Sequence, residues 1–100
     1  MPESLIGVWK TKTRKYRDRS FELQTDKVIF ETGKETSDTN IVLGVEAHDE
    51  KGRLLYDIGY LSSDGLEHTF SFYYDPMAGG VIALKNQSGI VWRKERRKKE

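Results

Sequence analysis

The 100-residue sequence predicts an all-β protein, a small eight-stranded antiparallel up-and-down barrel formed by one domain. Three observations support this fold. Apolar and polar residues alternate with a period of two over most of the chain, which is typical of half-buried strands. Clusters of Gly, Asp, Asn and Ser separate these segments at short intervals, which is typical of hairpin turns. No segment sustains the period of about 3.6 residues that a helix requires.

The expected elements begin with a short helical turn, because Pro2 suits the first position of a helix. Strands follow wherever the alternation is regular. It is clearest over residues 54–60 and 66–74, and a third regular segment covers residues 41–47. The remaining strands are expected at residues 5–10, 19–23, 27–31, 81–85 and 89–94.

Each of the three regular segments is expected to turn one apolar face inward. These faces carry Leu54, Tyr56, Ile58 and Tyr60, then Leu66, His68, Phe70, Phe72 and Tyr74, and finally Ile41, Leu43, Val45 and Ala47.

Short connections make consecutive strands hairpin neighbours, so the expected topology is a meander. Eight such strands leave exposed edges unless the sheet closes on itself, and closure into a barrel is the simplest solution. A two-sheet β-sandwich is the alternative. The barrel domain is expected to span residues 1–93, and the basic residues 94–100, which include no apolar side chain, are expected to form a disordered tail.

The terminal strands carry a pattern of their own. The first reads Gly7-Val8-Trp9, and the last ends with Trp92-Arg93. This resembles the calycin superfamily, which includes the lipocalins, because lipocalins have Gly-x-Trp on the first strand and an arginine that packs over this tryptophan. The resemblance implies that Arg93 covers Trp9, a contact that a cation–π interaction would stabilise. It also implies a binding role, with small apolar ligands in many members.

Large side chains on the inward faces could line a cavity for a small apolar or amphipathic ligand, or they could simply fill the barrel as a packed core. We expect a phenol and an imidazole to meet across the hairpin, because Tyr60 and His68 lie on consecutive strands. The candidate ligand-binding residues are Trp9, Phe30, Tyr56, Tyr60, His68, Phe70, Phe72 and Trp92.

Motifs for catalysis and metal binding are not found in the sequence. It contains no cysteine, no Gly-x-Ser-x-Gly and no phosphate-binding glycine loop followed by a helix. His48, Asp49 and Glu50 are consecutive at a strand end, so their side chains diverge and are interpreted as solvated charges. We therefore expect no metal and no cofactor, and we favour a binding protein over an enzyme.

Charge is segregated along the chain. Residues 10–19 contain six basic residues and one acid, and residues 76–100 contain seven basic residues and two acids, whereas the middle is acidic. Closure of a barrel would bring the two basic groups together, which suggests an interaction domain for an anionic partner such as nucleic acid, an acidic protein or a membrane surface. A solubilising surface is the simpler interpretation. The candidate anion-binding residues are Lys12, Arg14, Lys15, Arg17, Arg93, Arg96 and Arg97.

The N-terminal residues lack the basic and apolar regions of a signal peptide, and no run of about 18 apolar residues occurs in the chain. We therefore expect a cytoplasmic protein that is not transmembrane. The oligomeric state has no signature in the sequence.

Overall fold

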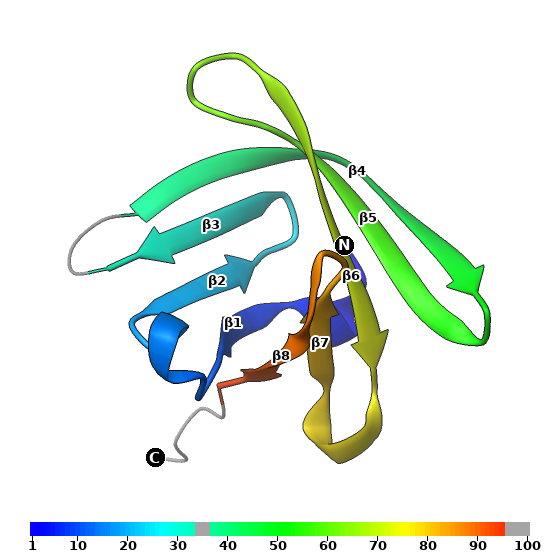
Figure 1. Cartoon of the computed structure of the whole chain (residues 1–100). Helices are drawn as coiled ribbons and strands as arrows, with labels where there is room; N and C mark the ends of the chain where they lie inside the picture. The colour runs from blue at the N-terminus through cyan, green and yellow to red at the C-terminus, as the bar shows by residue number, and fades with distance from the viewer. Residues whose placement is uncertain (34–36, 96–100) are drawn as a thin grey trace.

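Eight strands form one closed antiparallel barrel in the computed structural model, which describes residues 1–33 and 37–95 (Figure 1). Strands make up 64% of the described residues, and each strand pairs with its neighbours in sequence. The last strand pairs with the first, so the predicted up-and-down barrel is confirmed and the sandwich alternative is not adopted. The strands are β1 (Gly7–Lys10), β2 (Arg19–Leu23), β3 (Lys27–Thr32), β4 (Ser37–Glu50), β5 (Arg53–Leu61), β6 (Glu67–Asp75), β7 (Val81–Leu84) and β8 (Gln87–Lys94).

Helical structure in the described residues is confined to three 3-10 helices of three residues each. The first, η1 (Glu3–Leu5), follows Pro2 and confirms the expected N-terminal turn. The second, η2 (Arg14–Tyr16), joins β1 to β2, and the third, η3 (Met77–Gly79), joins β6 to β7.

The barrel is closed at one end around Trp9, which is 0% exposed. Its indole Nε1 donates a hydrogen bond to the carbonyl oxygen of Leu5 at 2.9 Å, so η1 is fastened to β1. Lys94 Nζ lies 5.5 Å from the centre of the Trp9 ring and donates to the carbonyl oxygen of Ser4 at 2.7 Å. The cation that covers the tryptophan is therefore a lysine.

The expectation that Arg93 covers Trp9 is wrong. Arg93 pairs with Lys10 across the β1–β8 ladder and is exposed. Trp92 is buried in the barrel, so strand alternation directs Arg93 outward and Lys94 toward the interior.

The last strand, β8, extends one residue beyond residue 93. Lys94 belongs to β8, and the Glu95 backbone N–H donates to the carbonyl oxygen of Val8 at 2.6 Å. The end of a lysine side chain is charged, but its methylene groups can pack on apolar surface. The methylene groups of Lys94 lie over Gly7. Of the tail expected at residues 94–100, residues 96–100 lie outside the described residues.

A β-bulge between Val42 and Gly44 changes the inward face of β4. Before the bulge Val42 packs against the core, and after it Val45 does. Ile41 and Leu43 are consequently on the outside, with 55% and 53% of their surface exposed. The single apolar face expected from Ile41 to Ala47 is therefore wrong, because one extra residue in a strand reverses the alternation.

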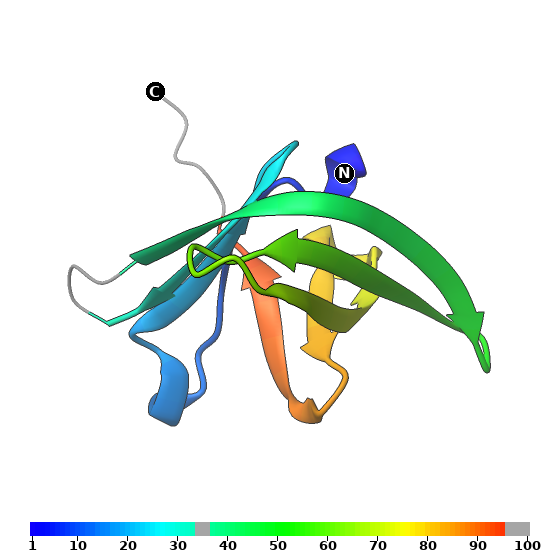
Figure 2. The same ribbon diagram turned by 90° about the horizontal axis from the view of Figure 1, so that it is seen from above.

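The barrel interior is filled by one cluster of apolar side chains, whose buried members come from η1 and from every strand except β4; β4 contributes the partly buried Val42 and Val45. Its buried members are Leu5, Trp9, Phe21, Leu23, Val28, Tyr56, Ile58, Phe72, Ile82 and Trp92. β4 and β5 run on together beyond the rest of the barrel, so that their turn stands clear of it (Figure 2). Both residues of this turn, Lys51 and Gly52, have positive φ angles of 54° and 84°, as a tight two-residue hairpin requires.

Candidate functional site

The open end of the barrel lies at the far end of β1 from η1. β2 begins at this end with Arg19 and Ser20, and β3 ends here. The helix η2 lies beside the same end. An aromatic wall crosses this mouth in a series of ring contacts with centroids 5.1–5.6 Å apart. In order of contact the rings are Tyr60, Phe30, Phe70, Phe21 and Trp92.

An apolar depression of about 240 Å³ lies in this mouth, and we call it the mouth pocket. Apolar side chains form one part of its lining. The polar part consists of Tyr16, Arg19, Ser20, Glu31, Thr32 and Gln87. The Gln87 side-chain amide donates to the Tyr16 hydroxyl at 3.4 Å, and the Arg19 guanidinium lies 5.3 Å from the Tyr16 ring centre. The residues of the apolar part are Phe21, Phe30, Phe70, Leu84 and Trp92.

Trp92, which lines the mouth pocket, carries an indole N–H that is buried. Trp92 is 5% exposed, and its Nε1 has no hydrogen-bond partner among the described residues. The other tryptophan, Trp9, satisfies its Nε1 with the carbonyl of Leu5. A buried donor without an acceptor costs about 1–3 kcal/mol. An acceptor atom on a bound molecule would remove this cost.

A second depression of about 300 Å³ adjoins the first, and we call it the rim hollow. Phe30 lines both. Tyr60 and His68 stack here as a cross-strand pair with ring centres 5.4 Å apart, so the predicted meeting of phenol and imidazole is confirmed. His68 is exposed at the rim, although its strand position suggested an inward side chain.

The rim hollow also holds carboxylates, from Asp38 and Asp64. Partial burial, and then the negative charge of Asp38, raise the pKa of Tyr60 above its ordinary value. The Ser62 hydroxyl hydrogen-bonds to Asp64, and this bond is the main cause that lowers the pKa of that carboxyl group. The rim hollow is therefore acidic and hydrogen-bonding, whereas the mouth pocket combines an aromatic lining with polar side chains that include Arg19 and Glu31.

The candidate ligand-binding residues are divided between the mouth and the core. Phe30, Tyr60, His68, Phe70 and Trp92 line the mouth pocket or the rim hollow. The other three, Trp9, Tyr56 and Phe72, belong to the packed core instead.

Some residues of the mouth were not recognised in the sequence, namely Tyr16, Arg19, Phe21 and Leu84. Phe21 and Leu84 lie on expected strands, but alternation shows only that a side chain points inward and not how far along the barrel it lies. Tyr16 and Arg19 were noted only for the basic segment to which they belong.

The two basic groups of the sequence do meet at the closure of the barrel. Lys10 of β1 is opposite Arg93 of β8, and a basic groove of about 590 Å³ runs along this seam. Lys10 also forms an ion pair with Glu95 at 3.3 Å, which neutralises part of the groove. The groove is lined by Lys10, Thr11, Lys12, Thr13, Gly89, Val91, Arg93 and Glu95.

The other predicted anion-binding residues lie near this groove in sequence. Arg14 and Lys15 belong to η2, and Arg17 follows it; all three are exposed. Lys15 Nζ lies 5.5 Å from the Tyr16 ring centre, so two cations, Lys15 and Arg19, lie against this ring. Arg96 and Arg97 lie outside the described residues.

Across the described residues, no helix has the length and apolar character needed to cross a membrane. No protein-family model matches the chain, and neither a curated protein nor a solved structure does. The fold and the mouth define a small, closed, antiparallel β-barrel with an aromatic pocket at one end. This architecture is compatible with a calycin-like fold.

Proposed function

We propose that this chain is a small, non-catalytic binding protein of calycin type, whose barrel mouth takes one small amphipathic ligand. The observation that carries this proposal is the mouth pocket, whose aromatic lining includes Trp92, a residue with a buried N–H that has no acceptor among the described residues. Apolar walls with a few placed polar groups are typical of small-molecule sites.

The geometry defines the kind of ligand. Its apolar part lies against Phe21, Phe30 and Phe70. An oxygen or nitrogen atom of the ligand accepts the hydrogen bond of Trp92 once neighbouring side chains move aside, because Nε1 is buried in this structure. The volume of about 240 Å³ is below the roughly 300–1,000 Å³ of sites for drug-sized molecules, so the ligand is small or leaves one end outside. That end meets Arg19 at the edge of the mouth pocket or the polar side chains of the rim hollow.

The calycin assignment is supported by the closed end of the barrel. The first-strand tryptophan is buried, fastened to η1 and covered by a cation from the last strand. A lysine takes the place that an arginine has in lipocalins.

An apolar anionic dye, 1-anilinonaphthalene-8-sulfonate, tests the site. We expect it to bind the protein with increased fluorescence, and we expect Leu84→Trp to weaken binding by about tenfold or more, because the larger ring fills the mouth pocket. Dye titrations of the parent and the variant, with excitation outside the tryptophan band, measure this change.

The matched control is Leu43→Trp, which makes the same replacement on the outer surface of β4. It should leave the dye affinity within about twofold of the parent value. Both variants should unfold cooperatively, because dye also binds partly unfolded protein. Unchanged binding by Leu84→Trp, or an equal loss in both variants, contradicts the proposed site.

A second candidate function is binding of an anionic partner at the basic groove. The observation in its favour is the pairing of Lys10 with Arg93, which joins the two basic segments on one surface. Thr11, buried beneath the groove, holds the seam together by donating to the carbonyl oxygen of Val91 at 2.7 Å.

For this second function, we expect single-stranded DNA to bind with an affinity that falls steeply between about 50 and 200 mM salt. Replacing both Lys12 and Arg93 by glutamine should reduce the slope of log affinity against log salt by about 1.4 units, because each cation displaces about 0.7 counterions from single-stranded DNA. Fluorescence anisotropy of labelled DNA measures the slope. A variant with glutamine at Lys27 and Lys51 removes the same charge elsewhere and should keep the parent slope; equal slopes in both double variants argue against the groove.

A further inference from the structure

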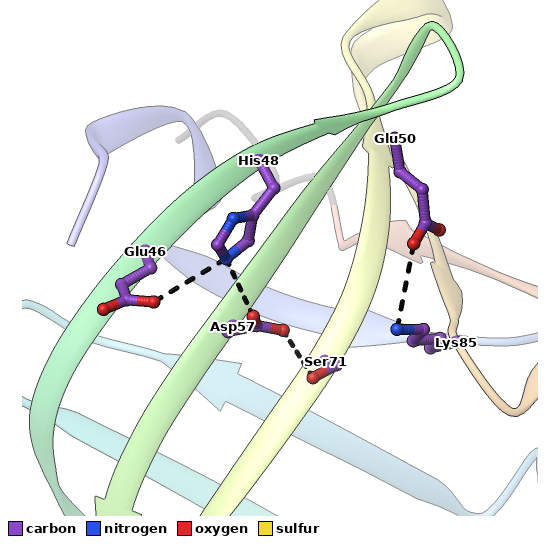
Figure 3. A network of polar contacts seen from close by, with 6 residues as sticks. All are labelled: Glu46, His48, Glu50, Asp57, Ser71 and Lys85. Atoms are coloured by element: carbon purple, nitrogen blue, oxygen red, sulfur yellow. Dashed lines mark hydrogen bonds and ion pairs between the residues drawn. The ribbon is translucent and has the colours of Figure 1, made fainter.

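Three side chains with metal-ligating atoms converge on the outer face of the sheet, away from the mouth (Figure 3). Glu46 and His48 occupy alternate positions of β4 and so project from the same face. Asp57 of β5 pairs directly with Glu46 across the ladder. Asp49, by contrast, is an immediate neighbour of His48 and projects from the opposite face.

The distances suit a single bound ion. His48 Nε2 lies 2.9 Å from Asp57 Oδ2 and 3.7 Å from Glu46 Oε1. All three ligand atoms lie within 4.8 Å of one another. Around a tetrahedral ion with bonds of about 2.0–2.1 Å, ligand atoms are about 3.3 Å apart. Small side-chain rotations are therefore enough to bring the three atoms into a coordination sphere.

Asp57 is held in position by a further residue. Its Oδ1 accepts a hydrogen bond from the Ser71 hydroxyl of β6 at 2.6 Å, which leaves Oδ2 facing the imidazole (Figure 3). Hydrogen bonds of this kind orient the ligands of metal sites and reduce the freedom lost on binding.

The local charge also favours a cation. In the described part of the chain, no lysine or arginine forms an ion pair with Glu46 or Asp57. Lys85, the basic side chain drawn in Figure 3, lies 3.9 Å from Glu50 instead. Arg53, on the same strand as Asp57, lies over the Tyr73 ring. Two carboxylates thus face a single imidazole.

Space for further ligands lies beside the cluster. A hollow of about 360 Å³ is lined by both carboxylates, and its other lining residues include Gly44 and Gly59, which carry no side chain. The β4 bulge brings Gly44 opposite Gly59 at this point. An ion held by three protein atoms could therefore complete its coordination with water from this hollow.

We propose that Glu46, His48 and Asp57 form a binding site for a divalent transition-metal ion, with Zn²⁺ as the best match. One imidazole and two carboxylates are ligands that Zn²⁺ accepts, whereas Ca²⁺ and Mg²⁺ prefer oxygen atoms alone. The imidazole must present an unprotonated Nε2. Binding of the ion at Nε2 therefore displaces any proton on this nitrogen, which moves to Nδ1 or to solvent.

Calorimetric titration of the chelator-treated, dialysed protein with ZnCl₂ tests the site. We expect one Zn²⁺ per chain. His48→Ala and Asp57→Asn should each weaken binding by about tenfold or more, and Ser71→Ala should weaken it by about 10–100-fold through loss of the Asp57 orientation. Zn²⁺ should raise the melting temperature of the parent and not that of His48→Ala, because an ion that binds only the folded state stabilises it.

The chain contains only two histidines, which makes His68→Ala the matched control. It should bind Zn²⁺ like the parent, and Asp49→Asn should do so as well. In NMR spectra of the parent, Zn²⁺ should shift the imidazole signals of His48 and leave those of His68 in place. Absence of one-to-one binding, parent-like affinity in His48→Ala, or a loss in His68→Ala as large as that in His48→Ala would each overturn the proposal.

Discussion

Replacing Trp9 by alanine is expected to lower the free energy of unfolding by about 3–5 kcal/mol. The side chain is 0% exposed and contacts the rings of Phe21 and Tyr74, with centroid distances of 6.4 and 6.3 Å. Its loss leaves a large cavity at the closed end and also frees the carbonyl of Leu5, which fastens η1 to the barrel. Urea denaturation followed by circular dichroism measures the change.

The control for Trp9→Ala is Met77→Ala, which truncates a large apolar side chain that is 72% exposed. Its unfolding free energy should stay within about 0.5 kcal/mol of the parent value. If Trp9→Ala unfolds like the parent, the resemblance to calycins fails at its most specific residue.

Gly7→Ala is expected to lower the free energy of unfolding by about 1–3 kcal/mol. Gly7 has a φ angle of +144°, which residues with a side chain rarely adopt. A methyl group there would also lie 3.1–3.3 Å from three carbon atoms of the Lys94 side chain, which covers Trp9. The first-strand glycine is thus required by backbone conformation and by the lysine that lies over it.

A double-mutant cycle separates these two causes. In the Lys94→Ala background no lysine side chain crowds the added methyl group. Gly7→Ala should therefore lower the free energy of unfolding by less than it does in the parent, and the difference measures the crowding. Gly44→Ala is the matched control, because its φ angle is not in the left-handed region and no atom lies within 4 Å of the added methyl group. Equal losses for Gly7→Ala and Gly44→Ala would contradict this explanation.

Some contacts of the barrel mouth can be inferred from the sequence, and others cannot. Tyr60 and His68 could be paired from the sequence, because they lie on consecutive strands joined by a short turn. Trp92 could be placed inside the barrel by alternation, but the missing acceptor for its N–H depends on every side chain around it. Satisfaction of a buried polar group is a property of the packed structure and has no local signature.

The same distinction explains why the metal-ligating cluster was not predicted. Its histidine was considered only with Asp49 and Glu50, its neighbours in sequence. The structure groups it with Glu46, two residues earlier on the same face, and with Asp57 from the next strand. Alternation could have suggested the first partner, but the second depends on the β4–β5 register.

The amino-acid sequence by itself determined the eight strands, their order and their closure into an up-and-down barrel. These features follow from alternation and turn residues, which act over a few positions of the chain. Only the tertiary structure decided that Lys94 and not Arg93 covers Trp9, that a bulge turns Leu43 outward, and which aromatic rings surround the mouth pocket. Each of these features depends on contacts between strands and not on local sequence. One extra residue in a strand reverses which face points inward, and closure of the barrel brings together side chains from the first and last strands.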